Sequence, residues 1–184
     1  MSKILGRRGI VTGIGFCITG MLGPVVSSFA FGEQVTKEKF EMQVIEYSAG
    51  GKEIVAGDYS AAIEALNGRM TLDSKYAKGT NLCVALTMQG EFSAAEGYCQ
   101  AAKSSSRRQN DSPLDSYIGG LNSRDKEALA LNNLGVHHAL NGNLLEAQEC
   151  LEIAVRKGGR YANTSERNMR ALEQRMALDV VASR

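Results

Sequence analysis

The chain has 184 residues, of which 43% are apolar and 22% are charged, a usage typical of one folded domain or a short repeat array. Two prolines and no tryptophan argue against a proline-rich ligand and against a sandwich built on a buried tryptophan. The formal net charge of +1 leaves no surplus of cationic side chains for a nucleic acid.

Residues 1–30 have the composition of an export signal. Three basic residues precede an uncharged apolar stretch over 10–26, and small residues follow it. This order predicts a secretory signal peptide that is cleaved after Ala30. The alternative is an uncleaved anchor in the inner membrane, but a span usually needs about 20 strongly apolar residues, and glycines and threonines dilute this stretch.

Cleavage would make the protein periplasmic or secreted and slightly acidic. It removes three basic residues and no acidic one, so the formal charge falls from +1 to −2. A nucleic-acid binder or a polybasic membrane-surface protein has the opposite balance. We therefore expect no nucleic acid as a partner, and no membrane contact once the signal is removed.

The sequence repeats one short phrase three times. Gly57–Ala62, Gly90–Ala95 and Gly142–Ala147 all contain glycine, a polar residue, a large apolar residue, two variable residues and alanine. The first two phrases lie 33 residues apart and the third follows 52 residues later, which fits a unit of about 34 residues plus an insertion of about 18. Each phrase predicts a turn between two antiparallel helices, in which the glycine takes the left-handed conformation.

Apolar residues recur at three- and four-residue steps between these turns, which indicates helix and not strand. Residues 31–106 then hold the first two repeats, 107–123 is a polar surface loop, and 124–184 hold the third repeat and a capping helix. In chain order we predict helices over 37–56, 59–70, 75–89, 92–103, 124–141, 144–157 and 164–182.

The third copy, over 127–159, resembles a tetratricopeptide repeat. Leu134-Gly135, Ala147 and Ala154 match the pattern of that family, with His138 in its aromatic place and Leu151 in its phenylalanine place. The second copy, over 76–107, matches less well, and the first, over 43–74, is the weakest because charged residues stand where the family has apolar or small ones. In the last copy, Gly135 and Ala147 would let the two helices approach closely, with Leu151 beside them.

The resemblance implies an all-α, right-handed helical-repeat solenoid of antiparallel helix pairs, with about three units and a C-terminal capping helix. The alternative is an unrelated helical bundle whose glycine turns arise by chance. In such a solenoid the first helix of each pair lines a concave groove, and asparagine amides there can hold a peptide backbone by paired hydrogen bonds. By analogy, the groove residues are Val44, Tyr47, Thr80, Asn81, Val84, Thr87, Asn132, Asn133, Val136 and Ala139.

Three cysteines would remain after signal cleavage, so at least one thiol stays unpaired. Cys83 lies seven residues before Gly90 and Cys99 nine after it, so a helical hairpin brings them to a similar depth. Two interpretations stay open for them: a disulfide that closes the hairpin, or two small buried packing residues. Cys150 is expected to be a packing residue.

His137 and His138 are the two histidines of the chain. Side chains of adjacent helical residues point about 100° apart, so we predict that the pair does not chelate one metal, with His138 packed inside and His137 near the surface. No nucleophile elbow, phosphate loop or dinucleotide fingerprint is present. The sequence therefore predicts no catalytic residue, no metal and no cofactor.

Together these features predict a noncatalytic exported repeat protein that binds a protein or peptide, either in its groove or through the 107–123 loop. The alternative function is a structural, self-associating subunit of a cell-envelope assembly. An enzyme with an unrecognised site is a third and less favoured hypothesis.

Overall fold

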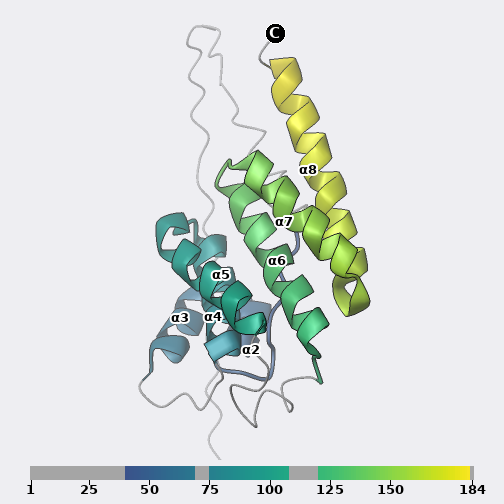
Figure 1. Cartoon of the computed structure of the whole chain (residues 1–184). Coiled ribbons are helices and arrows are strands. Elements are labelled where there is room, and N and C mark those ends of the chain that lie inside the picture. The colour runs from purple at the N-terminus through teal and green to yellow at the C-terminus, as the bar shows by residue number, and fades with distance from the viewer. Residues whose placement is uncertain (1–39, 69–74, 108–119, 183–184) are drawn as a thin grey trace, which may run out of the picture. The chain divides into compact units, whose positions relative to one another are not determined.

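All elements in the part of the chain that the structure describes are helical (Figure 1). The structure is a computed structural model, and it describes residues 40–68, 75–107 and 120–182. The all-α prediction is confirmed for these ranges. The predicted signal peptide lies outside them, as do residues 108–119 of the predicted loop.

Three helical hairpins are followed by one long helix. The five helices from residue 75 onward begin and end within three residues of their predicted bounds. The elements are α2 (Gly51–Val55) and α3 (Tyr59–Asn67), α4 (Lys75–Gln89) and α5 (Phe92–Ser106), α6 (Ser123–Leu140) and α7 (Leu144–Lys157), then the short 3₁₀ helix η2 (Gly159–Tyr161) and α8 (Ala162–Ala182).

The three repeated phrases turn the chain in the same way. Gly57, Gly90 and Gly142 have φ angles of 79°, 83° and 87°, in the left-handed region where glycine is unstrained. In each turn the residue after the glycine donates its N–H to the carbonyl five positions earlier, at 2.8–2.9 Å. The predicted helix–turn–helix geometry is therefore confirmed at all three phrases.

The first helices of successive hairpins lie side by side. In addition to the contacts within each hairpin, α4 packs against α6, and α6 packs against α8.

Small residues bring the two helices of the last hairpin close together. The space beside Gly135 is so narrow that a Cβ atom added there would lie 2.7 Å from Cγ of Leu151, and Ala147 and Leu151 are fully buried. The prediction that small residues bring α6 and α7 close together is confirmed.

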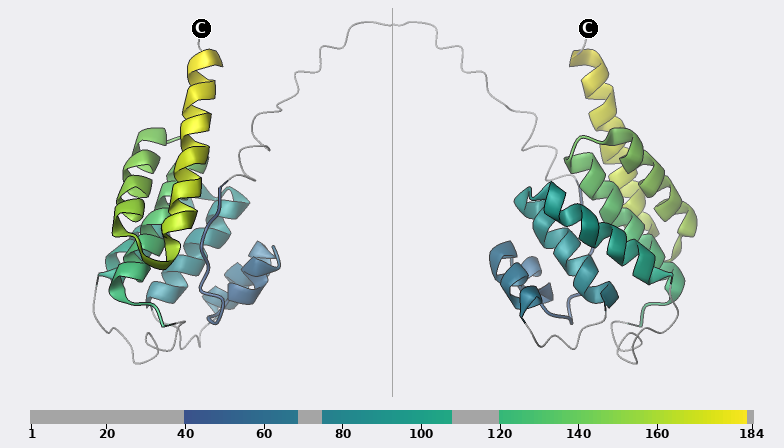
Figure 2. Two further views of the ribbon diagram at one scale, coloured as in Figure 1. Left: turned by 90° about the vertical axis from the view of Figure 1, so that its right-hand side faces the viewer. Right: turned by 60° about the vertical axis from the view of Figure 1, so that its left-hand side comes forward.

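The helix predicted over 37–56 is wrong in its described part. Residues 40–45 are extended, a turn follows over 46–50, and only Gly51–Val55 is helical. We call residues 40–45 the strap. Figure 2 shows it in dark blue, running alongside the helices. The strap is not helical because side chains of distant helices satisfy its backbone polar groups, as described below.

No helix among the described residues is both long and apolar enough to cross a membrane.

The end of the predicted 107–123 loop packs against the helices. Leu121 is buried there in a cluster with Tyr76, Ala77 and Leu129. This part of the loop docks onto the helices.

Candidate functional site

Three asparagines hold the strap by its backbone. Asn81 on α4, Asn133 on α6 and Asn168 on α8 are each at least 99% buried. Each bonds both the N–H and the carbonyl of one strap residue. We call these three side chains the asparagine ladder.

The ladder pairs with alternate residues of the strap. Asn133 Oδ1 accepts from the N–H of Gln43 at 2.7 Å, and its Nδ2 donates to the Gln43 carbonyl at 2.7 Å. Asn81 bonds Ile45 in the same manner at 2.9 and 3.0 Å. Asn168 bonds Glu41 at 2.9 and 2.8 Å. The N–H and C=O of every second residue point to one side of an extended chain, so this spacing fits an extended backbone.

The ladder residues occupy one position of the repeat. Asn81 and Asn133 each lie nine residues before the turn glycine of their hairpin, and Asn168 lies 35 residues after Asn133, about one repeat unit further. Equivalent positions on first helices project from the same face. The repeat therefore places three amides in a row, and α8, predicted as a cap, supplies the third.

Asn132 and the turn after the strap complete the network. Asn132 Nδ2 donates to the Glu41 carbonyl at 3.1 Å, and its Oδ1 accepts from Asn168 Nδ2 at 2.9 Å. Asn81 Nδ2 also lies 2.8 Å from Ser48 Oγ and 3.0 Å from the Ala49 carbonyl. The buried amides thus have partners on the strap or on one another, as buried polar groups require.

Apolar side chains fix the strap in register. Phe40 is buried in a cluster with Val136, Ala139 and Leu172, and Ile45 is buried with Tyr76 and Leu129. Met42 and Val44 are half-buried, and Val44 packs beside Val84. A shift by one residue would bring the charged Glu41 into an apolar site. The hydrogen bonds therefore recognise backbone, and these sites select side chains.

One ion pair adds to the strap's contacts. The carboxylate of Glu41 lies 2.6 Å from Nη2 of Arg167 on α8. Both side chains are about half exposed, so the pair adds little to stability and mainly favours an acidic residue at this place.

The predicted groove residues do not all line the groove. The residues that lie under the strap are Asn81, Asn132, Asn133, Val84, Val136 and Ala139. The prediction that Val44 lines the groove is wrong, because Val44 is part of the strap itself. Thr80 and Thr87 are fully buried; Thr87 faces His137, and Thr80 Oγ1 has no hydrogen-bond partner among the described residues.

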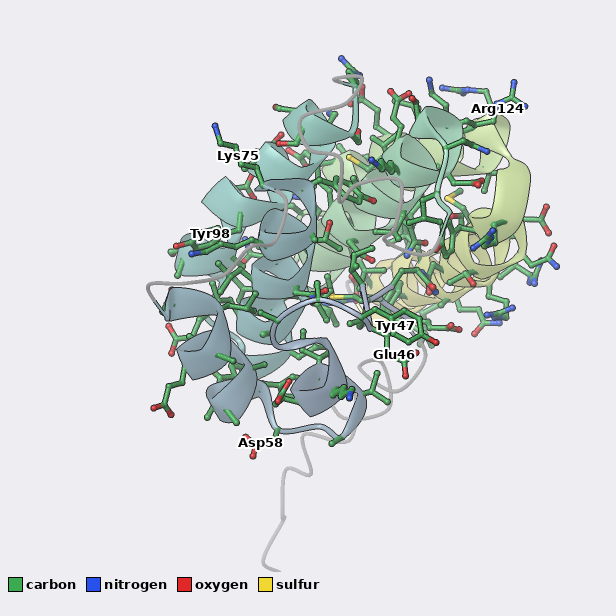
Figure 3. All side chains as sticks on the ribbon, turned by 90° about the horizontal axis from the view of Figure 1, so that it is seen from below. Glu46, Tyr47, Asp58, Lys75, Tyr98 and Arg124 are labelled. Atoms are coloured by element: carbon green, nitrogen blue, oxygen red, sulfur yellow. A yellow bond between two sulfur atoms is a disulfide. The ribbon has the colours of Figure 1, made fainter. Side chains whose placement is uncertain are left out.

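Tyr47 does not lie on a groove-lining helix as predicted, because it belongs to the turn after the strap, where the residue is 82% exposed. Figure 3 shows Tyr47 beside Glu46 at this turn. The predicted helix would have turned Tyr47 inward, whereas the extended strap ends before it.

The prediction that His137 lies near the surface is also wrong. His137 is fully buried, and its ring bridges three helices: Nδ1 lies 3.1 Å from Thr87 Oγ1 on α4, and Nε2 lies 2.8 Å from Glu96 Oε2 on α5. Phe92 meets the ring edge-on at 5.9 Å between centroids. The order hydroxyl, imidazole, carboxylate resembles a catalytic triad, but the buried Thr87 hydroxyl offers no access to a substrate.

The electrostatics of this cluster keep His137 neutral near pH 7. Burial lowers the pKa of His137, and the neighbouring Glu96 carboxylate only partly offsets this effect. For Glu96, burial alone would raise the pKa, but the hydrogen bond from Gln100 and the nearby histidines together lower it. A neutral ring facing a carboxylate through Nε2 carries its proton on that nitrogen and accepts from Thr87 at Nδ1.

The structure joins Cys83 and Cys99 in a disulfide between α4 and α5, with their Cα atoms 4.7 Å apart. Both cysteines are buried. Cys150 is a buried free thiol, and its burial raises its pKa, which disfavours the reactive thiolate. Of the two interpretations left open for Cys83 and Cys99, the structure therefore contains the disulfide.

Sequence reasoning missed Asn168 and the strap itself. The alternation of Phe40, Met42 and Val44 with polar residues has a period of two, which is the signal of an extended segment. Asn168 was visible as an asparagine one repeat unit beyond Asn133. The strap is missed because the first repeat is expected to open with a helix, and Asn168 is missed because the last helix is expected to serve only as a cap.

Comparisons with protein-family models, curated proteins and solved structures found nothing that matches this chain. Its function is therefore inferred from the strap and the groove that holds it.

Proposed function

We propose that this chain is a noncatalytic, tetratricopeptide-like solenoid that binds an extended segment of a partner protein in the groove now occupied by its own strap. The observation that supports this proposal is the asparagine ladder, in which three buried amides bond the backbone of alternate strap residues. Backbone recognition of this kind accepts any extended chain. The strap is then a resident occupant that a partner segment replaces.

The contacts of the strap define the partner's chemistry. The partner segment carries large apolar side chains at the places of Phe40, Met42, Val44 and Ile45, because these places are lined by apolar clusters. An acidic residue at the place of Glu41 gains the contact with Arg167. The preferred ligand is thus an extended peptide in which apolar residues alternate with polar or acidic ones and which ends in two consecutive apolar residues, as Val44 and Ile45 do.

The proposed location is the periplasm or the exterior of the cell. The signal-like composition of residues 1–30 supports it. The disulfide between Cys83 and Cys99 supports it independently, since such bonds persist in oxidising compartments.

Peptide binding to a protein with a weakened strap tests the proposal. The probe is a fluorescent peptide with the sequence of residues 39–46, and binding is followed by anisotropy. In the unaltered protein the strap competes at an effective concentration in the millimolar range, as for a short tether, so we expect weak binding. Replacing Phe40 and Met42 by alanine removes apolar contacts of the strap and should tighten peptide binding at least tenfold.

Adding Asn133→Asp to the weakened protein should abolish binding, because a carboxylate cannot donate to the peptide carbonyl. Asn141→Asp, an exposed change at the end of the same helix, is the matched control. Circular dichroism verifies that each variant is folded. If the peptide does not bind the folded weakened protein, or still binds after Asn133→Asp, the groove is not a peptide site.

A second candidate is self-association by exchange of straps. All ladder contacts join residues 36 to 127 positions apart, so a second copy of the chain can supply the strap with the same bonds. Light scattering distinguishes the two functions: strap exchange predicts a dimer that Asn133→Asp converts to monomer, whereas a peptide-binding module stays monomeric at all concentrations.

A further inference from the structure

A second cluster of polar groups lies away from the strap, between α5 and α6. Glu96 projects from α5, and His137 and His138 are adjacent on α6. One ligand atom from each of these residues lies within 4.8 Å of the other two. The two imidazole rings are tilted by 60° with centroids 5.4 Å apart, so neighbouring helical residues reach the same place despite their different directions.

His138 provides an independent observation that points to a ligand. His138 as a whole is 9% exposed, and its Nδ1 atom is buried with no hydrogen-bond partner among the described residues. A buried polar atom without a partner is unfavourable, and native structures contain few of them. A metal ion is a partner that an imidazole nitrogen binds well.

His137 is held in a position from which it can act as a ligand. Thr87 fixes the orientation of the ring from the other side, at 3.1 Å from Nδ1. When an ion takes Nε2, the ring proton moves to Nδ1 and is donated to Thr87 Oγ1, which a hydroxyl can accept.

We propose that Glu96, His137 and His138 form a zinc site that ties α5 to α6. Two imidazole nitrogens and one carboxylate oxygen are a known ligand set for Zn²⁺, with bonds of about 2.0–2.2 Å and a fourth position for water. His137 Nε2 and Glu96 Oε2 now lie 2.8 Å apart, and the ion replaces the proton between them. The Glu96 side chain is 41% exposed, so it can move to admit the ion from solvent.

The experiment measures zinc affinity of the full-length, tag-free protein by competition with a chromophoric chelator. We expect one zinc per chain. Glu96→Gln and His138→Gln each remove a ligand while keeping a similar shape, and each should lower the affinity at least 100-fold. Thr87→Val removes the orienting hydroxyl and should lower it about 10- to 100-fold, as outer-shell changes do.

Two controls separate this site from other zinc ligands. Glu173→Gln changes an exposed carboxylate on α8, and Cys150→Ala removes the free thiol of the described residues; both should leave the affinity unchanged. An affinity that either ligand variant leaves unchanged, or the absence of stoichiometric binding, would overturn the site.

NMR of the unaltered protein gives a second test that does not depend on how the variants fold. The chain has two histidines, so its imidazole nitrogen spectrum is simple to assign. Addition of zinc should shift one nitrogen of each ring, and on His137 this nitrogen should be Nε2. Zinc that leaves both rings unshifted would also refute the proposal.

Discussion

Asn133 and Gln43 exchange two hydrogen bonds of 2.7 Å although 90 residues separate them in the chain. The side-chain amide thereby replaces the neighbouring strand that an extended segment normally requires. Asn133 is 1% exposed, so its amide relies on the strap backbone for both bonds. This pair is the central one of the three in the ladder, so a substitution of Asn133 tests how much the ladder contributes to binding of the strap.

Asn133→Ala should destabilise the protein and release the strap. The change leaves the N–H and carbonyl of Gln43 without partners in a partly buried place, at a cost of about 1–3 kcal/mol per buried group. Urea unfolding measures the loss, and hydrogen exchange at Gln43 should accelerate. Asn141→Ala, on the exposed end of the same helix, should change stability by less than about 0.5 kcal/mol.

Loss of the disulfide should destabilise the α4–α5 hairpin. Cys83 and Cys99 close a loop of 16 residues, for which the loop-entropy model gives about 3 kcal/mol. Replacing both by alanine should therefore lower the unfolding midpoint. Mass spectrometry of a non-reduced digest should find the two cysteine peptides linked, and recovery of both as free thiols from oxidatively purified protein would contradict the bond.

Two glycine-to-alanine changes should have opposite effects. Gly135→Ala places a Cβ 2.7 Å from Leu151 Cγ, so overpacking should outweigh the gain in helix propensity and destabilise by about 1–3 kcal/mol. Gly97 in α5 has open space around its Cβ position, so Gly97→Ala should stabilise by about 0.5–1 kcal/mol. Thermal melts of the two variants check the signs.

Acidification should remove the contribution of Glu127 to stability. Burial alone would raise the pKa of Glu127, but Lys157 and Arg107, whose nitrogens lie 2.5 and 3.1 Å from its oxygens, lower it overall. A carboxyl whose pKa is lowered on folding stabilises above its unfolded pKa of about 4.3 and loses that effect as the pH falls through the folded pKa. The stability difference between the unaltered protein and Glu127→Gln should be largest near pH 7 and shrink toward pH 3.

That difference should also decrease with salt, since Arg107 and Lys157 are partly exposed. Urea titrations at several pH values measure it. A difference that is independent of pH would mean that Glu127 acts by packing and not by charge.

The helices from residue 75 onward could be predicted because their limits are local. The glycines at 90 and 142 end helices in a conformation that other residues rarely adopt, and the apolar period between them is helical. Asn81 and Asn133 could also be selected as backbone-binding residues, since their place in the repeat and their chemistry are both visible in the sequence.

The period of two in residues 40–44 indicates an extended segment, but where this segment binds, and how the histidine cluster forms, depend on distant residues and could not be predicted. Residues 40–45 are extended only because amides from three helices complete their hydrogen bonds. His137 is buried because Thr87 and Glu96, 50 and 41 residues earlier, satisfy both of its nitrogens. A single segment of sequence contains neither partner.

The pairing of Glu41 with Asn168 has a consequence for biosynthesis. The two residues are 127 positions apart, so the ribosome delivers the strap long before the last rung of its ladder has been translated. Until α8 emerges, the apolar side chain of Phe40 lacks part of its final surroundings. We therefore expect the strap to complete its contacts only after α8 has been synthesised, so that its docking is a late step of folding.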